Sequence, residues 1–120
     1  MKKNRLIIDG SHNEDGARVL NEYLQTLKCN KHIIIGMMKN KEHKKYISYF
    51  KDISSITTID LKTQINSISG KDLKEKFKGI PNVKYQPNIE QAIKSIDCKE
   101  GDLLLITGSL YCAAEVLNLN

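Results

Sequence analysis

The sequence predicts an α/β domain with a Rossmann-like, three-layer sandwich: a mostly parallel sheet of five to six strands with helices on both faces. Short apolar runs alternate with segments of helical periodicity from one end of the chain to the other. Such alternation favours a parallel sheet with right-handed crossovers. One run, Leu103–Ile106, is apolar without interruption, which is typical of a strand buried on both faces.

The first half of the chain predicts three strands and two helices. We expect the strands at Arg5–Asp9, His32–Gly36 and Ser54–Ile59, the last rich in Ile and Thr. A helix over about Asn13–Lys28, capped by Asn13 or Ser11, would bury a face made of Ala17, Leu20, Tyr23, Leu24 and Leu27. A second helix, capped by Asn40, would bury Tyr46, Ile47 and Phe50.

The second half continues the alternation after a polar loop at Asp60–Ile68. A capping box at Ser69–Asp72 predicts a short helix through Phe77, and Val83–Gln86 predicts a strand. The next helix carries Ile89, Ala92, Ile93 and Ile96 at helical spacing. A last helix, begun by Thr107-Gly108-Ser109, would bury Leu110, Ala113, Ala114 and Leu117. No linker or repeat divides residues 1–120, so we expect one domain.

Composition narrows the possible functions. The net charge is +5, but the chain has two Arg and no Trp, so nucleic-acid binding is disfavoured. No apolar run reaches the ~18 residues of a membrane span and no leader is recognised, so we expect a cytoplasmic protein that does not bind membranes. The three Cys are widely spaced and the three His form no ligand pattern, which predicts reduced thiols and no metal site.

Three predicted strand-to-helix loops carry polar groups: Asp9–Asn13, Met37–Lys41 and Thr107–Ser109. In an open parallel sheet such loops lie at one edge, where ligands bind. Asp9 could accept hydrogen bonds from a diol such as a ribose or assist metal binding, or it could simply cap a turn. His12 could contact a phosphate or carboxylate, or lie in solvent at the start of a helix.

The last of these loops is a candidate anion site. Its backbone N–H groups, the hydroxyls of Thr107 and Ser109 and the helix dipole suit a carboxylate or phosphate, although ordinary N-capping is the commoner role. Lys39 and Lys41 could balance a negative ligand, or be solvated. The sequence contains no phosphate loop, no G-x-G-x-x-G fingerprint and no recognised nucleophile set, so we assign no catalytic residue and expect no complete ATP-using site.

Three motifs run in order through essentially the whole chain: Asp9-Gly10-Ser11-His12-Asn13 with Gly16-Ala17, Gly36-Met37-Met38-Lys39-Asn40-Lys41-Glu42, and Thr107-Gly108-Ser109-Leu110-Tyr111. Together they resemble the carboxyl-terminal domain of folylpolyglutamate synthase/dihydrofolate synthase, in the Mur ligase superfamily. The first and last motifs are fairly specific. The middle one departs from the common Asp-Lys-Asp form at Asn40 and Glu42, and Ser11 and Glu14 stand where Ala and Pro are usual.

The resemblance implies an ATP-dependent ligase that forms an acyl phosphate on a carboxylate of folate or dihydropteroate, which the amine of L-glutamate then attacks. Asp9 would hold the ATP ribose, His12 and Asn13 would also bind ATP, and Ser109 and His12 would bind glutamate. Other crevice residues would be Gly10, Ser11, Lys39, Lys41, Thr107, Gly108 and Tyr111. A central ATPase domain, absent from this chain, would supply the phosphate loop and most Mg²⁺ ligands, and we expect a monomer.

The family also has a Pro-Gly-Arg segment just upstream, whose Arg contacts ATP. This chain begins at Met1–Arg5, after that segment, and Arg5 is no convincing substitute. We therefore expect the isolated chain to lack ligase activity. Two alternatives remain open: a stand-alone α/β module that binds a nucleotide or amino acid without catalysis, and a degenerate remnant of the ligase.

Overall fold

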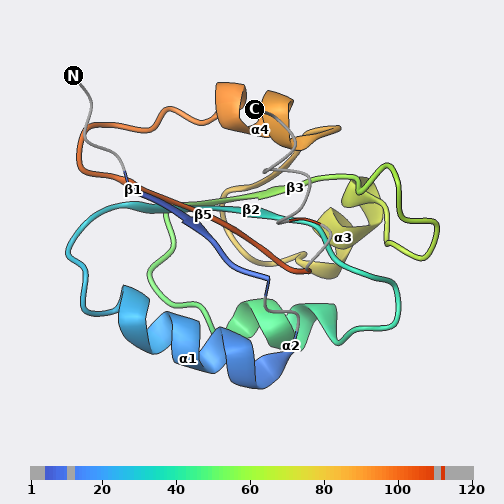
Figure 1. Cartoon of the computed structure of the whole chain (residues 1–120), viewed down its shortest axis with the longest axis horizontal. Helices are drawn as coiled ribbons and strands as arrows, with labels where there is room; N and C mark the ends of the chain where they lie inside the picture. The colour runs from blue at the N-terminus through green and yellow to red at the C-terminus, as the bar shows by residue number, and fades with distance from the viewer. Residues whose placement is uncertain (1–4, 11–12, 110–111, 113–120) are drawn as a thin grey trace.

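The computed structural model describes residues 5–10, 13–109 and 112. Five parallel strands form one sheet: β1 (Arg5–Ile8), β2 (Lys31–Ile35), β3 (Ser55–Thr58), β4 (Val83–Tyr85) and β5 (Leu103–Thr107). Their order is β1-β5-β2-β3-β4, so the last strand lies between the first two (Figure 1). The register aligns Ile7 with Leu105 and Leu105 with Ile33. The predicted α/β class is confirmed, with five strands among the described residues.

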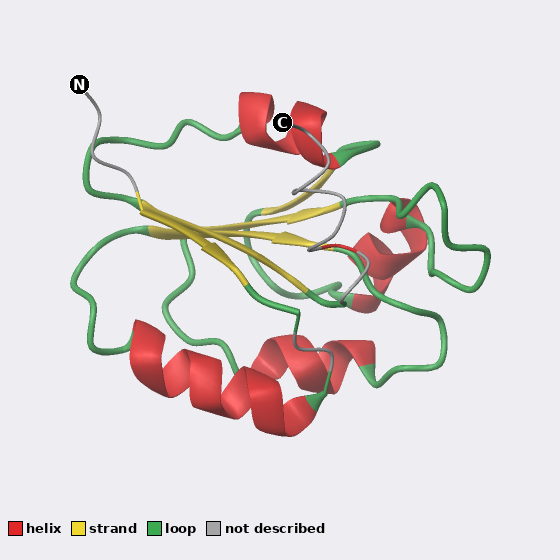
Figure 2. Cartoon of the chain, in the orientation of Figure 1, coloured by secondary structure: helices red, strands yellow, loops and turns green. Residues whose placement is uncertain are grey.

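In the described part of the chain, four helices cover the two faces of the sheet, which is the central layer in Figure 2. They are α1 (Glu14–Leu24), α2 (His43–Ser48), α3 (Gly70–Lys76) and α4 (Ile89–Ser95). The first three connect strands that advance across the sheet, whereas α4 connects β4 back to β5. Right-handed crossovers in opposite directions place their helices on opposite faces, which explains why α4 lies alone on its side among the described helices.

The core has two parts because side chains alternate along each strand. On one face Ile33, Ile35 and Leu105 pack with residues of α1, α2 and α3, including Leu24, Tyr46 and Leu73. On the other face Ile34 and Ile106 pack with Ile89 and Ala92 of α4. All of these side chains are almost completely buried. No helix in the described part of the chain combines the length and apolar character needed to cross a bilayer.

Three helices begin at a side-chain cap, and two of these caps, Asn13 and Ser69, were predicted. The side chains of Asn13, Ser69 and Asn88 each accept a hydrogen bond from the amide three residues later, at 2.9, 3.1 and 2.8 Å. Each bond satisfies an amide that has no partner within its helix. The predicted helix starts at Ser69 and Asn13 are therefore confirmed, with Ser69 and Asn13 as the caps.

Two local predictions are wrong, and a third lies outside the described residues. The first helix ends at Leu24, not near Lys28 as predicted. Tyr23, which we expected on the buried face, is 51% exposed because it lies about 100° round the helix from the buried Leu24. Asn40 does not cap α2, whose N-cap is Glu42 and whose first turn follows a loop held by His43. The predicted last helix falls almost entirely in residues 110–111 and 113–120, which the structure does not describe.

Candidate functional site

The carboxyl ends of β1, β5 and β2 bring three predicted loops to one edge of the sheet (Figure 1). Asp9 follows β1, Gly108 and Ser109 follow β5, and Gly36 follows β2. The backbone of Asp9 donates to the carbonyl of Ile106 at 2.9 Å, so the first loop is held directly against β5. This juxtaposition is what the sequence predicted from the parallel order of the strands.

Two hydroxyls, of Thr107 and Tyr46, lie in a line behind the half-buried Asp9 carboxylate. The Thr107 hydroxyl donates to Asp9 Oδ2 over a long distance of 3.5 Å, while the Tyr46 hydroxyl lies 2.7 Å from Thr107 Oγ1. If the Thr107 proton points to Asp9, the Tyr46 O–H must donate to Thr107, because a threonine hydroxyl has one proton. Thr107 and Tyr46 are buried, so a rigid pair of hydroxyls stands behind the carboxylate.

Gly108 allows β5 and β2 to approach at this edge. Its φ of +115° is one that residues with a Cβ rarely adopt. A Cβ built at this position would also meet the carbonyl oxygen of Gly36. The position therefore requires glycine both for its backbone conformation and for the space available.

Ser109 is a buried capping residue. Its side chain is 2% exposed, and its Oγ accepts a hydrogen bond from the amide of Cys112 at 3.0 Å. This is the capping role that the sequence left open as the commoner alternative. Because a serine hydroxyl can donate as well as accept, the role of Ser109 as a donor to a carboxylate stays a prediction.

A shallow pocket of 180 Å³ lies between the loop after β1 and the loop after β2. It is lined by Asn13, Glu14, Asn40, Lys41, Glu42 and Tyr46. Pockets for small organic ligands usually have about 300–1,000 Å³, so this one could enclose only part of a nucleotide. Among the described residues that line it, Lys41 is the one cation, and Asn13 uses its Oδ1 to cap α1.

Glu14 in this lining already has cationic and hydroxyl partners. Lys45 lies 3.3 Å from its carboxylate, and the Tyr49 hydroxyl donates to it at 2.9 Å. The bond to Glu14 raises the pKa of Tyr49, since the neutral phenol is the donor. These contacts join the first turn of α1 to α2 and fix one wall of the pocket.

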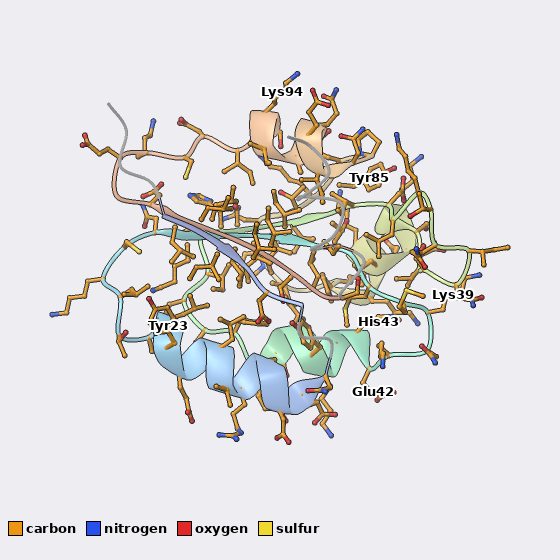
Figure 3. All side chains as sticks on the ribbon, in the orientation of Figure 1. Tyr23, Lys39, Glu42, His43, Tyr85 and Lys94 are labelled. Atoms are coloured by element: carbon orange, nitrogen blue, oxygen red, sulfur yellow. The ribbon has the colours of Figure 1, made fainter. Side chains whose placement is uncertain are left out.

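Lys39 is directed elsewhere. With Ile68, Ser69, Asp72, Glu75 and Lys76, it lines a separate cavity of 600 Å³ beside α3. His43 holds the intervening loop, because its Nε2 donates to the Met38 carbonyl at 2.8 Å (Figure 3 labels both Lys39 and His43). Lys41 therefore shares a pocket with Asn13, whereas Lys39 does not. Ser11, His12 and Tyr111 lie outside the described residues.

Sequence reasoning missed three polar side chains near this edge. Tyr46 was expected only as a core residue, yet its hydroxyl contacts Thr107. Asp60 lies just after β3, much as Asp9 lies just after β1, and this position at a strand end was the signal that could have identified it. Its carboxylate accepts hydrogen bonds from the Tyr85 hydroxyl at 2.5 Å and from the Gly70 amide at 2.7 Å. The bond to Asp60 and partial burial raise the pKa of Tyr85 to about 12.

Comparison with known proteins finds one family and one curated relative that each match most of the chain. Residues 1–110 match the model of the family described as Mur ligase, glutamate ligase domain. The dihydrofolate synthase/folylpolyglutamate synthase of Bacillus subtilis (strain 168) is 27% identical over 113 residues. That match covers 91% of this chain and 26% of the relative, so the chain spans about a quarter of the relative's length.

Solved structures share the fold. Escherichia coli FolC in complex with ADP superposes with a TM-score of 0.80 at 23% identity, over 95% of this chain and 28% of that one. The folylpolyglutamate synthase of Mycobacterium tuberculosis gives 0.83 at 18% identity, over 95% of this chain and 29% of that one. The folylpolyglutamate synthase of Thermotoga maritima superposes with a TM-score of 0.82 at 20% identity, over 95% of this chain and 27% of that one. The resemblance stated from the three motifs is therefore confirmed.

Proposed function

The chain belongs to the Mur ligase glutamate ligase domain family, and on that premise we propose that it serves an ATP-dependent ligase that joins L-glutamate to folate or dihydropteroate. The names of its relatives support the folate branch. A bifunctional folylpolyglutamate synthase/dihydrofolate synthase with the same fold (TM-score 0.83, 19% identity) was solved with Mn, AMPPNP and L-glutamate bound. In the proposed reaction, the acyl phosphate formed on the folate carboxylate is attacked by the glutamate amine, which releases phosphate.

The observation that carries this proposal is the Asp9 carboxylate, supported by Thr107 at the carboxyl edge of the sheet. A carboxylate in a fixed position can accept both hydroxyls of a ribose, which suits it to orient a nucleotide. Ser109, on the adjacent strand end, would donate its hydroxyl to a glutamate carboxylate. Both residues bind and orient substrate in this proposal, and neither takes part in a proton transfer.

The chemistry at phosphorus would need groups from elsewhere. Bound Mg²⁺ would neutralise charge on the phosphates, but the described residues present no cluster of three metal-ligating side chains at this edge. We therefore derive no step through Mg²⁺ from this chain. We propose that a phosphate-loop domain supplies those ligands. This chain, which we propose is a single domain, would contribute the contacts to the ribose and to glutamate.

Separate titrations of the purified chain with ATP and L-glutamate test these roles. We expect Asp9→Asn to weaken ATP binding about 10-fold and Ser109→Ala to weaken glutamate binding by a similar factor, since each removes a hydrogen bond to ligand. The control is Asp97→Asn, because Asp97 is exposed, pairs with Lys99 and lies in the connection from α4 to β5, at the other edge of the sheet. Equal binding by Asp9→Asn and the unmodified chain would contradict the proposed ribose contact.

The alternatives are a stand-alone binding module and a remnant without catalysis. The DNA upstream of the coding sequence discriminates between them and the ligase. A reading frame for a phosphate-loop domain there supports the ligase, whereas its absence favours one of the alternatives. Ligand binding by the chain alone would then separate a working module from a remnant.

A further inference from the structure

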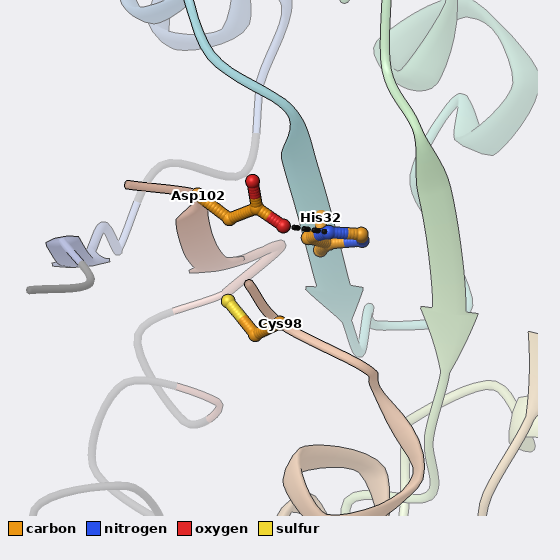
Figure 4. Close-up of side chains that lie close together, drawn as sticks. All are labelled: His32, Cys98 and Asp102. Carbon is orange, nitrogen blue, oxygen red and sulfur yellow. Dashed lines mark hydrogen bonds and ion pairs between the residues drawn. The ribbon is translucent and has the colours of Figure 1, made fainter. Parts of the chain in front are cut away.

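A second group of reactive side chains lies at the opposite, amino-terminal edge of the sheet. His32 is on β2, Asp102 directly precedes β5, and Cys98 lies in the connection from α4 to β5 (Figure 4). One imidazole nitrogen, the thiol sulfur and one carboxylate oxygen all lie within 4.8 Å of one another. The group has no part in the proposed ligase function, which uses the other edge.

The group is protected from solvent and held in place. The side chains of His32 and Asp102 are 12% and 7% exposed. His32 Nε2 lies 3.2 Å from Asp102 Oδ2, and its Nδ1 lies 2.7 Å from the Ser55 hydroxyl. The amide of Lys99 donates to Asp102 Oδ2 at 2.9 Å, and this bond is the main reason why the pKa of Asp102 is lowered.

The thiol, imidazole and carboxylate of this group are a combination of ligands that suits zinc. Thiolate, imidazole and carboxylate are the three ligand types of Zn²⁺ sites, and a site with three protein ligands keeps its fourth position open. In a tetrahedral zinc site with bonds of 2.0–2.3 Å, ligand atoms lie about 3.3–3.8 Å apart. Side-chain rotations that move the ligand atoms by about 1 Å would therefore bring the three groups to coordinating distance.

We propose that His32, Cys98 and Asp102 form a zinc site, with Nε2, Sγ and Oδ2 as ligands and water in the fourth position. The ion takes the place of the proton between Nε2 and Oδ2, and the Cys98 thiol loses its proton to solvent as the Zn–S bond forms. Nδ1 then carries the imidazole proton and donates it to Ser55 Oγ. Such a partner behind a ligating histidine fixes its orientation and tautomer.

The sequence could not have predicted this site. His32 and Asp102 are 70 residues apart and follow no familiar ligand spacing, and only the parallel pairing of β2 with β5 brings them together. The inference replaces our expectation that the three cysteines and the histidines have no role with metals. Its failure would leave the ligase proposal unaffected, because the two sites use different edges and different residues.

Titration of the metal-free chain with Co²⁺, followed by competition with Zn²⁺, tests the proposal. We expect one equivalent of Co²⁺ to give a sulfur-to-cobalt charge-transfer band and the intense visible bands of tetrahedral cobalt, both removed by one equivalent of Zn²⁺. Cys98→Ser should abolish the charge-transfer band. Ser55→Ala should keep the band but weaken Zn²⁺ binding about 10- to 100-fold, as expected for loss of a partner that orients a ligand.

The matched control is Cys29→Ser, because Cys29 is a half-buried cysteine like Cys98 but lies outside the group. This variant should retain the band and the stoichiometry. The proposal is overturned if the band is absent from the unmodified chain, persists in Cys98→Ser, or disappears in Cys29→Ser. Circular dichroism of each variant establishes that a lost band does not reflect unfolding, and Asp102→Asn supplies a second ligand variant if Cys98→Ser fails to fold.

Discussion

The hydroxyl pair of Thr107 and Tyr46 is the feature that separates Asp9 from an ordinary aspartate at a strand end. An aspartate that only capped a turn would need no buried hydroxyl behind its carboxylate. Here Thr107 lies between the carboxylate and the core, and Tyr46 reaches it from α2, 61 residues away in sequence. Two side chains distant in sequence therefore stand behind the carboxylate: Thr107, which contacts it, and Tyr46, which contacts Thr107.

Removing the two hydroxyls should reveal their coupling. Thr107→Val and Tyr46→Phe should each lower the free energy of unfolding by about 1 kcal/mol, because each removes a buried hydrogen bond. The double variant should lose less than the sum, since both substitutions break the same bond. Urea denaturation measures all three values, with the exposed Ser48→Ala as control. Strict additivity would show that the hydroxyls do not interact.

Tyr85 offers a prediction about pH. Its pKa of about 12 exceeds the ordinary value of 10.0, because the protonated phenol donates to Asp60. The stabilisation is complete below pH 10 and is lost as the pH rises from 10 through 12, since only the unfolded chain loses the proton readily in that range. Phenolate absorbance should show a step near pH 12 that Tyr85→Phe removes. In Asp60→Asn that late step should move toward pH 10, and an unchanged titration would contradict the assignment.

At the scale of elements, the glycine that joins β5 to the next turn should be sensitive to substitution. Gly108→Ala should destabilise the fold by more than about 3 kcal/mol, because positive φ strain and contact with the Gly36 carbonyl act together. Gly101→Ala is the matched control: its φ is +88°, but a Cβ there would meet no atom within 4 Å, so only the strain of about 1–3 kcal/mol applies. Thermal unfolding of both variants compares them. Equal losses would show that the close approach at Gly108 costs nothing.

Most elements were predictable because their signals are local. Asn13, Ser69 and Asn88 mark helix starts through a side chain that bonds an amide three residues away, and apolar runs mark the strands. The end of α1 was not predictable, since the chain leaves the helix through short turns at Thr26 and Leu27 without a glycine or proline to signal the stop. The Asn40 prediction failed for a similar reason: a longer-range bond from His43 to Met38 delays the start of α2.

The site was predictable in outline and not in detail. Parallel strand order placed the loops after β1, β2 and β5 at one edge, whatever their exact contacts. The contribution of Tyr46 and the orientation of Lys39 depend on packing between α2, α3 and the loops, for which the sequence carries no periodic signal. The same limit explains why the group of His32, Cys98 and Asp102 emerged only from the pairing of strands.

For the whole molecule, the two edges of one sheet carry different chemistry. The carboxyl edge presents Asp9, the Thr107–Ser109 turn and a pocket of 180 Å³, whereas the amino edge carries the thiol, imidazole and carboxylate. The central strands β2 and β5, which run between the two edges, are largely buried and are paired along their length. A substitution at one edge should therefore leave binding at the other unchanged, as expected for distant sites without shared partners.

The absence of a phosphate loop from the sequence leads to our last prediction, on activity. The purified chain alone should produce no glutamate-extended folate in the presence of ATP, Mg²⁺ and L-glutamate. A phosphate loop would be needed to position the transferred phosphoryl group, and the described residues at the carboxyl edge form no cluster of three metal-ligating side chains. Mass spectrometry of the folate product measures this directly, with the full-length Bacillus subtilis relative assayed in parallel as the positive control. Extension that requires ATP and is lost in Asp9→Asn would overturn the prediction, because this chain would then hold a complete site.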